Sequence, residues 1–206
     1  MKNIIQSIII GISIAAIPGP IFFELVRRTL TKGFWNGALL SVGEFLGNFT
    51  LLILIFYGIS SFLNYPVFQM LLYVLGGAIL AWLGIIALKL KEENIDKSYT
   101  DAGKSSNSIF VGFTIAVSSP IVIALWFSLS GSYLAKFTSP FTAFLNIFFI
   151  AFGFIIFFFS LAAIIHYTRH KIPSKYVILL SKIFGLILLG YGGSFIYKFF
   201  TLLIKI

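Results

Sequence analysis

The chain has 206 residues, of which 59% are hydrophobic and only 10% are charged. Soluble domains contain about 25% charged residues, so this composition excludes an ordinary soluble domain and indicates a helical protein that crosses a lipid bilayer several times. The formal net charge of +9 would favour nucleic-acid binding in a soluble protein. Here we interpret it as a signal of membrane topology, and we predict no nucleic-acid partner.

Six apolar runs are long enough to cross a bilayer, which takes about 20 helical residues. They are Ile4–Val26, Phe34–Phe62, Val67–Leu88, Ile109–Ser130, Phe141–Ile165 and Tyr176–Phe200. The first run ends at two arginines and has no small-residue cleavage site, so we expect a membrane span and not a signal peptide. The predicted fold class is therefore all-α and polytopic, with six transmembrane helices.

Basic residues are distributed unevenly between the ends of these runs. Ten lie at one set of ends: Arg27, Arg28, Lys32, Lys89, Lys91, Lys97, Lys104, Arg169, Lys171 and Lys175. Four lie at the other: Lys2, Lys136, Lys198 and Lys205. Because cytoplasmic loops are enriched in Lys and Arg, this split predicts a cell-membrane protein with both termini outside the cytoplasm.

A polar linker over residues 89–108 divides the chain into two halves of three spans, residues 1–88 and 109–206. The linker is rich in Lys, Glu, Asp and Ser, which is typical of a cytoplasmic loop. The two halves resemble one another, because Gly11–Ala15 in the first span matches Gly112–Ala116 in the fourth.

The third and sixth spans also match, at glycine pairs that support the same repeat. The pairs are Gly77 with Gly185 and Gly84 with Gly192. An odd number of spans per half forces the second half to run through the membrane in the opposite direction. We therefore predict a 3+3 inverted-topology repeat, an arrangement that recurs in secondary transporters with sites near the bilayer midplane.

The stretch Ile17-Pro18-Gly19-Pro20 lies inside the first apolar run and cannot continue an ordinary helix. Each proline removes a backbone N–H donor and clashes with the carbonyl group four residues earlier. In hydrocarbon an unsatisfied backbone group is costly, so a broken helix persists only against protein or a wet cavity. We predict a substrate-binding site at Pro18, Gly19 and Pro20; the alternative is a structural kink.

The stretch Ser118-Ser119-Pro120 occupies the corresponding position in the second half. Proline is favoured at the first position of a helix, so Pro20 and Pro120 are expected to open the second part of each broken span. Ser119 stands at an N-cap position, where its hydroxyl can accept from free amides. Two inward helix N-termini would offer N–H groups to an anion such as a substrate carboxylate.

Only two acidic residues, Glu24 and Glu44, fall within the predicted spans. Glu44 lies near the bilayer midplane, where a charge is costly, so we expect it to face the bundle interior. Asn48 follows one turn later on the same face, and Gly43-x-x-x-Gly47 favours close approach of another helix. We predict that Glu44 binds a substrate amino group, the coupling proton, or each in turn. The alternative is a protonated structural glutamic acid.

Two further candidates have open roles. Glu24 is close to Arg27 and Arg28, so both a site role and an ion pair at the cytoplasmic edge are open. Trp126 could line the site or anchor the chain at the membrane interface. The sequence has no cysteine, P-loop, nucleophile elbow or His/Asp/Glu set of metal-ligand spacing. We therefore predict no cofactor, no metal site and no enzymatic activity.

Over nearly its whole length, the sequence resembles the LysE/RhtB family of amino-acid exporters. The matching residues are Gly11 and Pro18-Gly19-Pro20 in the first span, Gly43, Gly47 and Asn48 in the second, Phe110, Gly112, Ser119 and Pro120 in the fourth, and the glycine pairs of the third and sixth. The resemblance implies export of amino acids such as lysine, arginine, homoserine, threonine or leucine, driven by the proton-motive force. The chain departs from the family pattern at Ser119, where Asn is usual, and at Ile121, where many members have Lys, which puts those common substrates in doubt.

The function predicted from the sequence is secondary active export of amino acids or related small cationic solutes, coupled to protons. Two alternatives stay open: an inorganic cation exporter of the same superfamily, and a membrane assembly or scaffold protein that transports nothing. The expected partners are the lipid bilayer, an amino-acid substrate and H⁺, and homo-oligomer formation is an open question.

Overall fold

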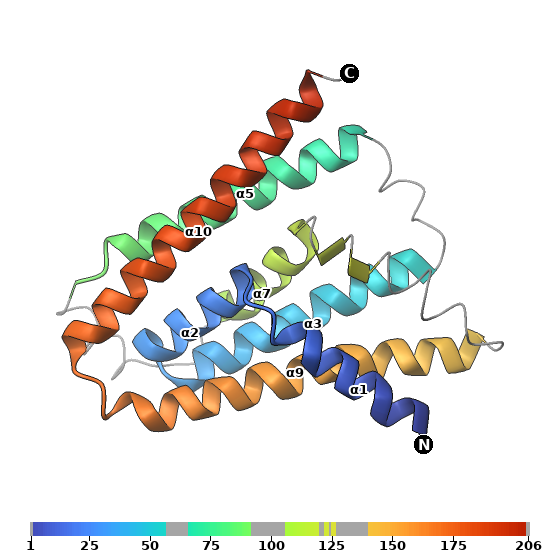
Figure 1. Cartoon of the computed structure of the whole chain (residues 1–206), viewed down its shortest axis with the longest axis horizontal. Coiled ribbons are helices and arrows are strands. Elements are labelled where there is room, and N and C mark those ends of the chain that lie inside the picture. The colour runs from blue at the N-terminus through green and yellow to red at the C-terminus, as the bar shows by residue number, and fades with distance from the viewer. Residues whose placement is uncertain are drawn as a thin grey trace.

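The computed structural model describes residues 2–56, 66–91, 106–119, 122–123, 125–126 and 140–204, and within these ranges the regular structure is helical. The helices are α1 (Lys2–Ala15), α2 (Pro20–Lys32), α3 (Phe34–Phe56), α5 (Pro66–Leu88), α7 (Ser106–Ser118), α9 (Pro140–Arg169) and α10 (Ser174–Leu203). Figure 1 shows α5 and α10 side by side along one side of the molecule, with α1, α2, α3, α7 and α9 forming the remainder.

Among the described helices, α3, α5, α9 and α10 are each long and apolar enough to cross a bilayer. Helices α1 and α2 together make a fifth candidate span, bent by 77° at the break. Helix α7 is apolar but shorter, and most of the predicted fourth span beyond it lies outside the described residues, including Pro120. The prediction of an all-helical polytopic membrane protein is confirmed, with four to five candidate spans in the described part of the chain.

A single residue joins α2 to α3. Gly33 has a φ of 86°, a conformation that glycine adopts without steric cost, and its N–H donates to the Thr29 carbonyl at 3.1 Å. Helix α2 therefore ends at Lys32, and α3 begins only two residues later, at Phe34. Arg27 and Arg28, which follow the first apolar run in the sequence, lie within α2, where both are helical and buried.

Glycines set the closest helix contacts. On α5 and α10, a Cβ atom at Gly84 would lie 2.8 Å from the Gly185 carbonyl oxygen, and one at Gly192 would lie 3.0 Å from that of Gly77. Small residues allow helices to pack closely where hydrophobic association is weak, as it is in a bilayer. The glycines that match between the third and sixth predicted spans therefore lie where α5 and α10 meet.

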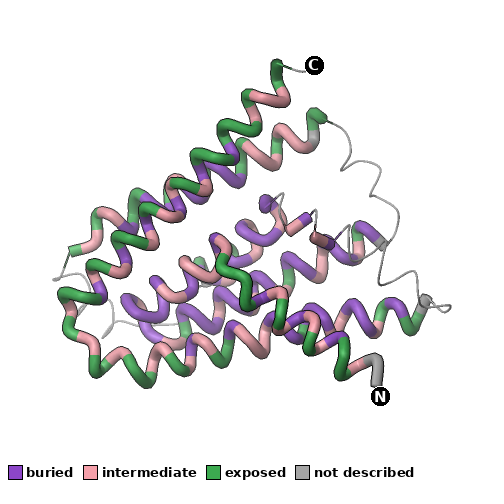
Figure 2. Tube along the Cα trace, in the orientation of Figure 1, coloured by how far each residue is buried: buried purple, intermediate pink, exposed green. Residues whose placement is uncertain are grey.

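Buried residues are concentrated where α2, α3 and α7 meet, as Figure 2 shows. The outer faces of α5, α9 and α10 are exposed and rich in large apolar side chains, among them Leu71, Phe152 and Leu186. An exposed apolar face of this extent is typical of a surface in contact with lipid.

Candidate functional site

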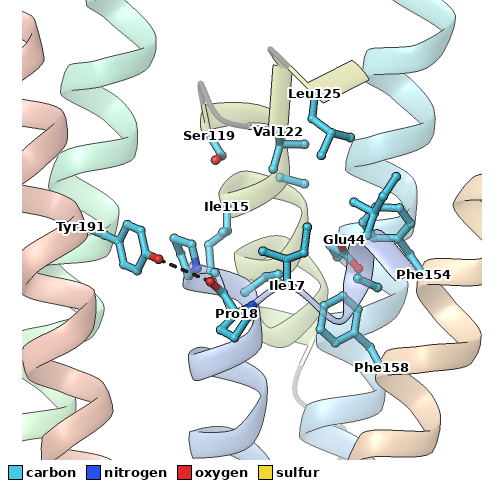
Figure 3. A pocket seen from close by; sticks show the side chains of 16 residues that line it. Ile17, Pro18, Glu44, Ile115, Ser119, Val122, Leu125, Phe154, Phe158 and Tyr191 are labelled. Atoms are coloured by element: carbon cyan, nitrogen blue, oxygen red, sulfur yellow. Dashed lines mark hydrogen bonds between the residues drawn. The ribbon is translucent and has the colours of Figure 1, made fainter. Parts of the chain in front are cut away.

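A cavity of about 330 Å³ lies against the break between α1 and α2 (Figure 3). Its lining is mostly apolar and comes from six regions of the chain. The residues are Ile14, Ala15, Ile17, Pro18, Gly19, Pro20, Ile21, Glu44, Ile115, Ala116, Ser119, Val122, Leu125, Phe154, Phe158 and Tyr191. The structure therefore brings together five of the predicted site residues: Pro18, Gly19, Pro20, Glu44 and Ser119.

The break itself follows from its prolines. Helix α1 ends at Ala15, and Gly19 is extended, with φ −136° and ψ −177°. Pro20 occupies the first turn of α2, where a missing N–H is harmless, and no side chain caps this end of the helix. The Pro18 carbonyl, which the break frees, accepts a hydrogen bond of 3.4 Å from the Tyr191 hydroxyl of α10.

Glu44 is on α3 and is almost fully buried, with 3% of its surface exposed. Its Oε1 atom accepts a hydrogen bond from the Asn48 amide at 2.9 Å. Its Oε2 atom is buried and has no hydrogen-bond partner within the described residues. An unpartnered carboxyl oxygen beside a cavity is rare in folded proteins and indicates a place for a proton or a ligand.

Asn48 is held in turn by Trp126, whose indole Nε1–H donates to Asn48 Oδ1 at 2.9 Å. An indole is only a donor, so this bond directs the Asn48 oxygen to Trp126 and its NH₂ group to Glu44. Neither Asn48 nor Trp126 lines the cavity, and both are buried behind Glu44. The two residues thus orient the carboxyl group rather than contact the cavity, which differs from the lining role considered for Trp126.

Close packing of α7 on α3 fixes the turn of α3 that contains Glu44. A Cβ atom at Gly112 would overlap the Leu40 carbonyl oxygen and lie 3.0 Å from the Glu44 backbone nitrogen. A Cβ atom at Gly43 would likewise overlap the Ile109 carbonyl oxygen. The close approach predicted from the glycines of the second span is therefore present at the site.

The second predicted break is described only in part, because Pro120 lies outside the described residues. Helix α7 ends at Ser118, whose hydroxyl donates to the Thr114 carbonyl at 2.5 Å and does not line the cavity. Ser119 lines the cavity, and its carbonyl accepts from Ile123 N–H at 3.1 Å. Gly19 accepts from Phe23 in the same way at 3.2 Å, directly before Pro20.

Glu24 lies outside the cavity lining, in a buried ionic cluster. Arg27 donates to both of its oxygens, at 2.8 and 2.7 Å, and Arg28 donates to Oε1 at 2.6 Å. Arg28 also donates to Ser108 at 2.9 Å, and Ser108 donates to Asn36 at 3.1 Å, so the cluster joins α2, α7 and α3. Of the two roles left open for Glu24, the geometry corresponds to the ion pair.

Sequence reasoning did not single out Phe154, Phe158 or Tyr191. Hydropathy gives no signal for them, because they are aromatic residues in aromatic-rich spans. The repeat could have found the two phenylalanines: counted from Gly43 and from Gly153, Phe154 matches Glu44 and Phe158 matches Asn48.

A family model described as LysE type translocator matches residues 12–199. "Putative amino acid efflux protein YcgF" of Bacillus subtilis is 27% identical over 202 residues, covering 96% of this chain and 97% of that protein. "Chemotactic transduction protein ChpE" of Pseudomonas aeruginosa is 30% identical over 132 residues, covering 64% of each chain. No solved structure matches.

The family model spans both sides of the helix break, the Glu44 turn and the Tyr191 region, so the match includes every element that lines the cavity. The resemblance inferred from the Pro-Gly-Pro stretch and the glycine pattern is thereby confirmed. The chain belongs to the family of LysE type translocators.

Proposed function

We propose that this protein is a secondary active transporter that exports amino acids, or closely related solutes with an ammonium group, in exchange for protons. The observation that supports it most directly is that Glu44, a residue that lines the cavity, has a buried Oε2 atom without a hydrogen-bond partner in the described residues. A buried carboxyl group is stable when it binds a proton or a cation. A solute of about this cavity's size is a natural ligand, since small-molecule sites start at about 300 Å³.

The two ends of an amino acid have separate places in this proposal. The ammonium group binds Glu44 Oε2. The carboxylate binds the N-terminus of α2, where the first-turn N–H groups have no intrahelical partner and no side-chain cap. Gly19, Pro20 and Ile21 line the cavity at this helix end. Ser119, at the second break, supplies a further polar group.

Coupling follows from a single carboxyl group that serves two ligands. When Glu44 holds a proton it cannot form an ion pair with an ammonium group, and when it binds the ammonium group the proton must leave. Each ligand therefore displaces the other, and a proton gradient can drive the solute outward. Asn48 and Trp126 keep Oε1 occupied, so the exchange takes place at Oε2.

We further propose six spans in a 3+3 inverted repeat, with residues 1–88 and 109–206 as the repeats and 89–108 as a cytoplasmic loop. A hydrogen bond that occurs twice supports this. Ser7 of α1 donates to Asn146 of α9 at 2.6 Å, and Ser108 of α7 donates to Asn36 of α3 at 3.1 Å. Each serine lies four residues before the glycine of the matched Gly-x-x-Ile-Ala stretch of its half.

Equivalent glycine contacts also occur in both halves, between α1 and α9 and between α7 and α3. Gly11 of α1 packs on the Ile150 carbonyl of α9, and Gly112 of α7 packs on the Leu40 carbonyl of α3. Two pairs of cavity residues are also equivalent at the spacing of this glycine match: Ile14 with Ile115, and Ala15 with Ala116. This arrangement supports a site between the two repeats, as in other inverted-repeat transporters.

The proposed location is the cell membrane, with both termini outside the cytoplasm. The support is the distribution of basic residues, because Lys32 ends α2, Arg169 ends α9, and Lys171 and Lys175 lie at the turn into α10. Arg169 donates to the Leu30 carbonyl of α2 at 2.8 Å, which joins α9 to this end of α2. Loops enriched in Lys and Arg remain in the cytoplasm.

A second candidate function is a membrane partner in signalling that transports nothing, which the name of the Pseudomonas aeruginosa relative favours. Such a protein does not require a carboxyl group that exchanges a proton for another ligand. The two candidates therefore differ in whether Glu44 is needed.

The test is Glu44→Gln in proteoliposomes with an imposed pH gradient and a panel of labelled amino acids. Glutamine keeps the shape of the side chain and its bond to Asn48 but cannot exchange a proton, so gradient-driven transport is expected to be lost. Ser13→Ala is the matched control, because Ser13 is an exposed α1 residue that bonds only within its own helix, to the Ile9 carbonyl. Full gradient-driven transport by Glu44→Gln would refute the role of Glu44, and no transport of any amino acid by the wild-type protein would refute the exporter proposal.

A further inference from the structure

The cavity contains few groups that could neutralise a charged ligand. Glu44 is the only charged side chain among its described lining residues, and Ser119 and Tyr191 are the only other polar ones. The Tyr191 hydroxyl already donates to the Pro18 carbonyl. No lysine or arginine is among these lining residues, so the described cavity offers one negative group and one helix N-terminus.

The other acidic residues of the sequence do not provide a second partner for a cation in this cavity. The sequence has six acidic residues in total. Glu24 has both oxygens bonded by Arg27 and Arg28. The other four, Glu92, Glu93, Asp96 and Asp101, belong to the polar linker of the sequence. A solute with two ammonium groups could therefore pair only one of them, and an unpaired charge is strongly disfavoured in a buried site.

The walls around Glu44 are suited to an uncharged group. Ile115, Val122, Leu125, Phe154 and Phe158 all line the cavity, and Figure 3 shows their side chains there together with Glu44. The same reasoning excludes a side-chain carboxylate, because the α2 N-terminus can neutralise only the carboxylate common to all amino acids. The volume of about 330 Å³ lies at the lower end of the range for small-molecule sites, about 300–1,000 Å³.

From these observations we infer that the transported solute is an amino acid with an uncharged, apolar side chain, and not a basic or acidic one. The inference rests on the proposed function and specifies the substrate class of the same site. It narrows the substrates implied by the family resemblance, because lysine and arginine would each bring a second cation into an apolar cavity. The single acid of the cavity serves the α-ammonium group.

The experiment compares matched pairs of amino acids in proteoliposomes of the wild-type protein under one imposed pH gradient. Norleucine and lysine share a four-carbon side chain, to which lysine adds a terminal ammonium group. Norvaline and glutamate share a three-carbon side chain, in which glutamate has a carboxylate in place of the terminal methyl group. Norleucine and norvaline are expected to be transported at least tenfold more efficiently, in kcat/KM, than their charged counterparts.

The outcomes separate this inference from the proposed function. Transport of lysine or glutamate as efficient as that of its neutral counterpart would overturn the inference and leave an amino-acid exporter. Transport of none of the four would overturn the exporter proposal itself.

A variant gives an independent measurement. Phe154→Glu adds a second carboxyl group to the cavity, at the position in α9 that matches Glu44 in α3. The ratio of lysine to norleucine transport is expected to rise at least tenfold in this variant relative to the wild type. An unchanged ratio in a folded variant would count against the inference, and if the variant does not fold, the wild-type comparison decides alone.

Discussion

Two buried glutamates on neighbouring helices have opposite surroundings. Glu24 of α2 is fully buried, and three hydrogen bonds from Arg27 and Arg28 occupy both of its oxygens. Glu44 of α3 is 3% exposed, and one of its oxygens has no partner among the described residues. A carboxylate that is saturated by fixed cations stabilises the fold, whereas one with an open oxygen can exchange ligands. Depth of burial alone does not distinguish these two roles; the partners do.

Removing the charge of Glu24 is the most drastic way to test this comparison. Glu24→Gln leaves two buried arginines without a counter-charge, and loss of one partner from a buried ion pair costs about 3–5 kcal/mol. We expect a large drop in the thermal unfolding temperature in detergent and poor recovery of folded protein. Glu44→Gln, the matched variant, is expected to unfold close to the wild-type temperature because its amide still accepts from Asn48. Equal unfolding temperatures for the two variants would show that the paired and open glutamates do not differ in structural role.

The parts of this comparison that sequence reasoning anticipated depend on short-range rules. Proline chemistry predicted the break at Pro18 and Pro20, and helical spacing placed Asn48 beside Glu44. The positions of Arg27 and Arg28, three and four residues after Glu24, did not decide whether Glu24 forms an ion pair or belongs to the site, because the same spacing is compatible with a solvated loop. The structure resolves this, because Glu24, Arg27 and Arg28 all lie within α2, which ends only at the Gly33 turn and packs on α3, α9 and α10.

Long-range contacts account for most of what the sequence could not predict. Trp126 and Asn48 are 78 residues apart, and no spacing rule joins them. Phe154 and Phe158 face the cavity, yet hydropathy cannot separate a phenylalanine that faces a ligand from one that faces lipid. The serines and asparagines that form the equivalent bonds between α1 and α9 and between α7 and α3 occupy matching positions in the two halves of the sequence. Their pairing could not be predicted, because it requires knowing which helices are neighbours.

The backbone around Glu44 offers a second, smaller test. In Gly112→Ala the new methyl group would overlap the Leu40 carbonyl oxygen, so α7 and α3 must separate next to the Glu44 turn. Overpacking of this kind costs about 1–3 kcal/mol, and we expect both lower thermal stability and reduced gradient-driven transport. Gly193→Ala is the control, because a Cβ atom there has no neighbour within 4 Å and alanine favours the helix. If the two alanine variants were equally stable and active, close packing of α7 would not be what fixes Glu44.

The smallest effect is expected from a change at Trp126. Such a change alters how the Glu44 carboxyl group is oriented but leaves the carboxyl group itself in place. Trp126→Phe keeps an aromatic ring to pack near Phe154, whose ring centroid lies 5.7 Å from that of Trp126, but removes the donor to Asn48. One lost hydrogen bond costs about 1 kcal/mol, so transport is expected to fall about fivefold at saturating pH gradient while the protein stays folded.

If Trp126 acts only through Asn48, its effect depends on the amide being present. Asn48→Leu alone should reduce transport at least as much as Trp126→Phe, and adding Trp126→Phe to Asn48→Leu should change little more, since the two residues form one chain of hydrogen bonds to Glu44. The dependence of transport on the size of the pH gradient is the informative measurement, because a purely structural defect lowers transport equally at all gradients. Independent, additive losses would mean that Trp126 supports the site through packing, and that some other contact determines which Glu44 oxygen stays without a hydrogen-bond partner.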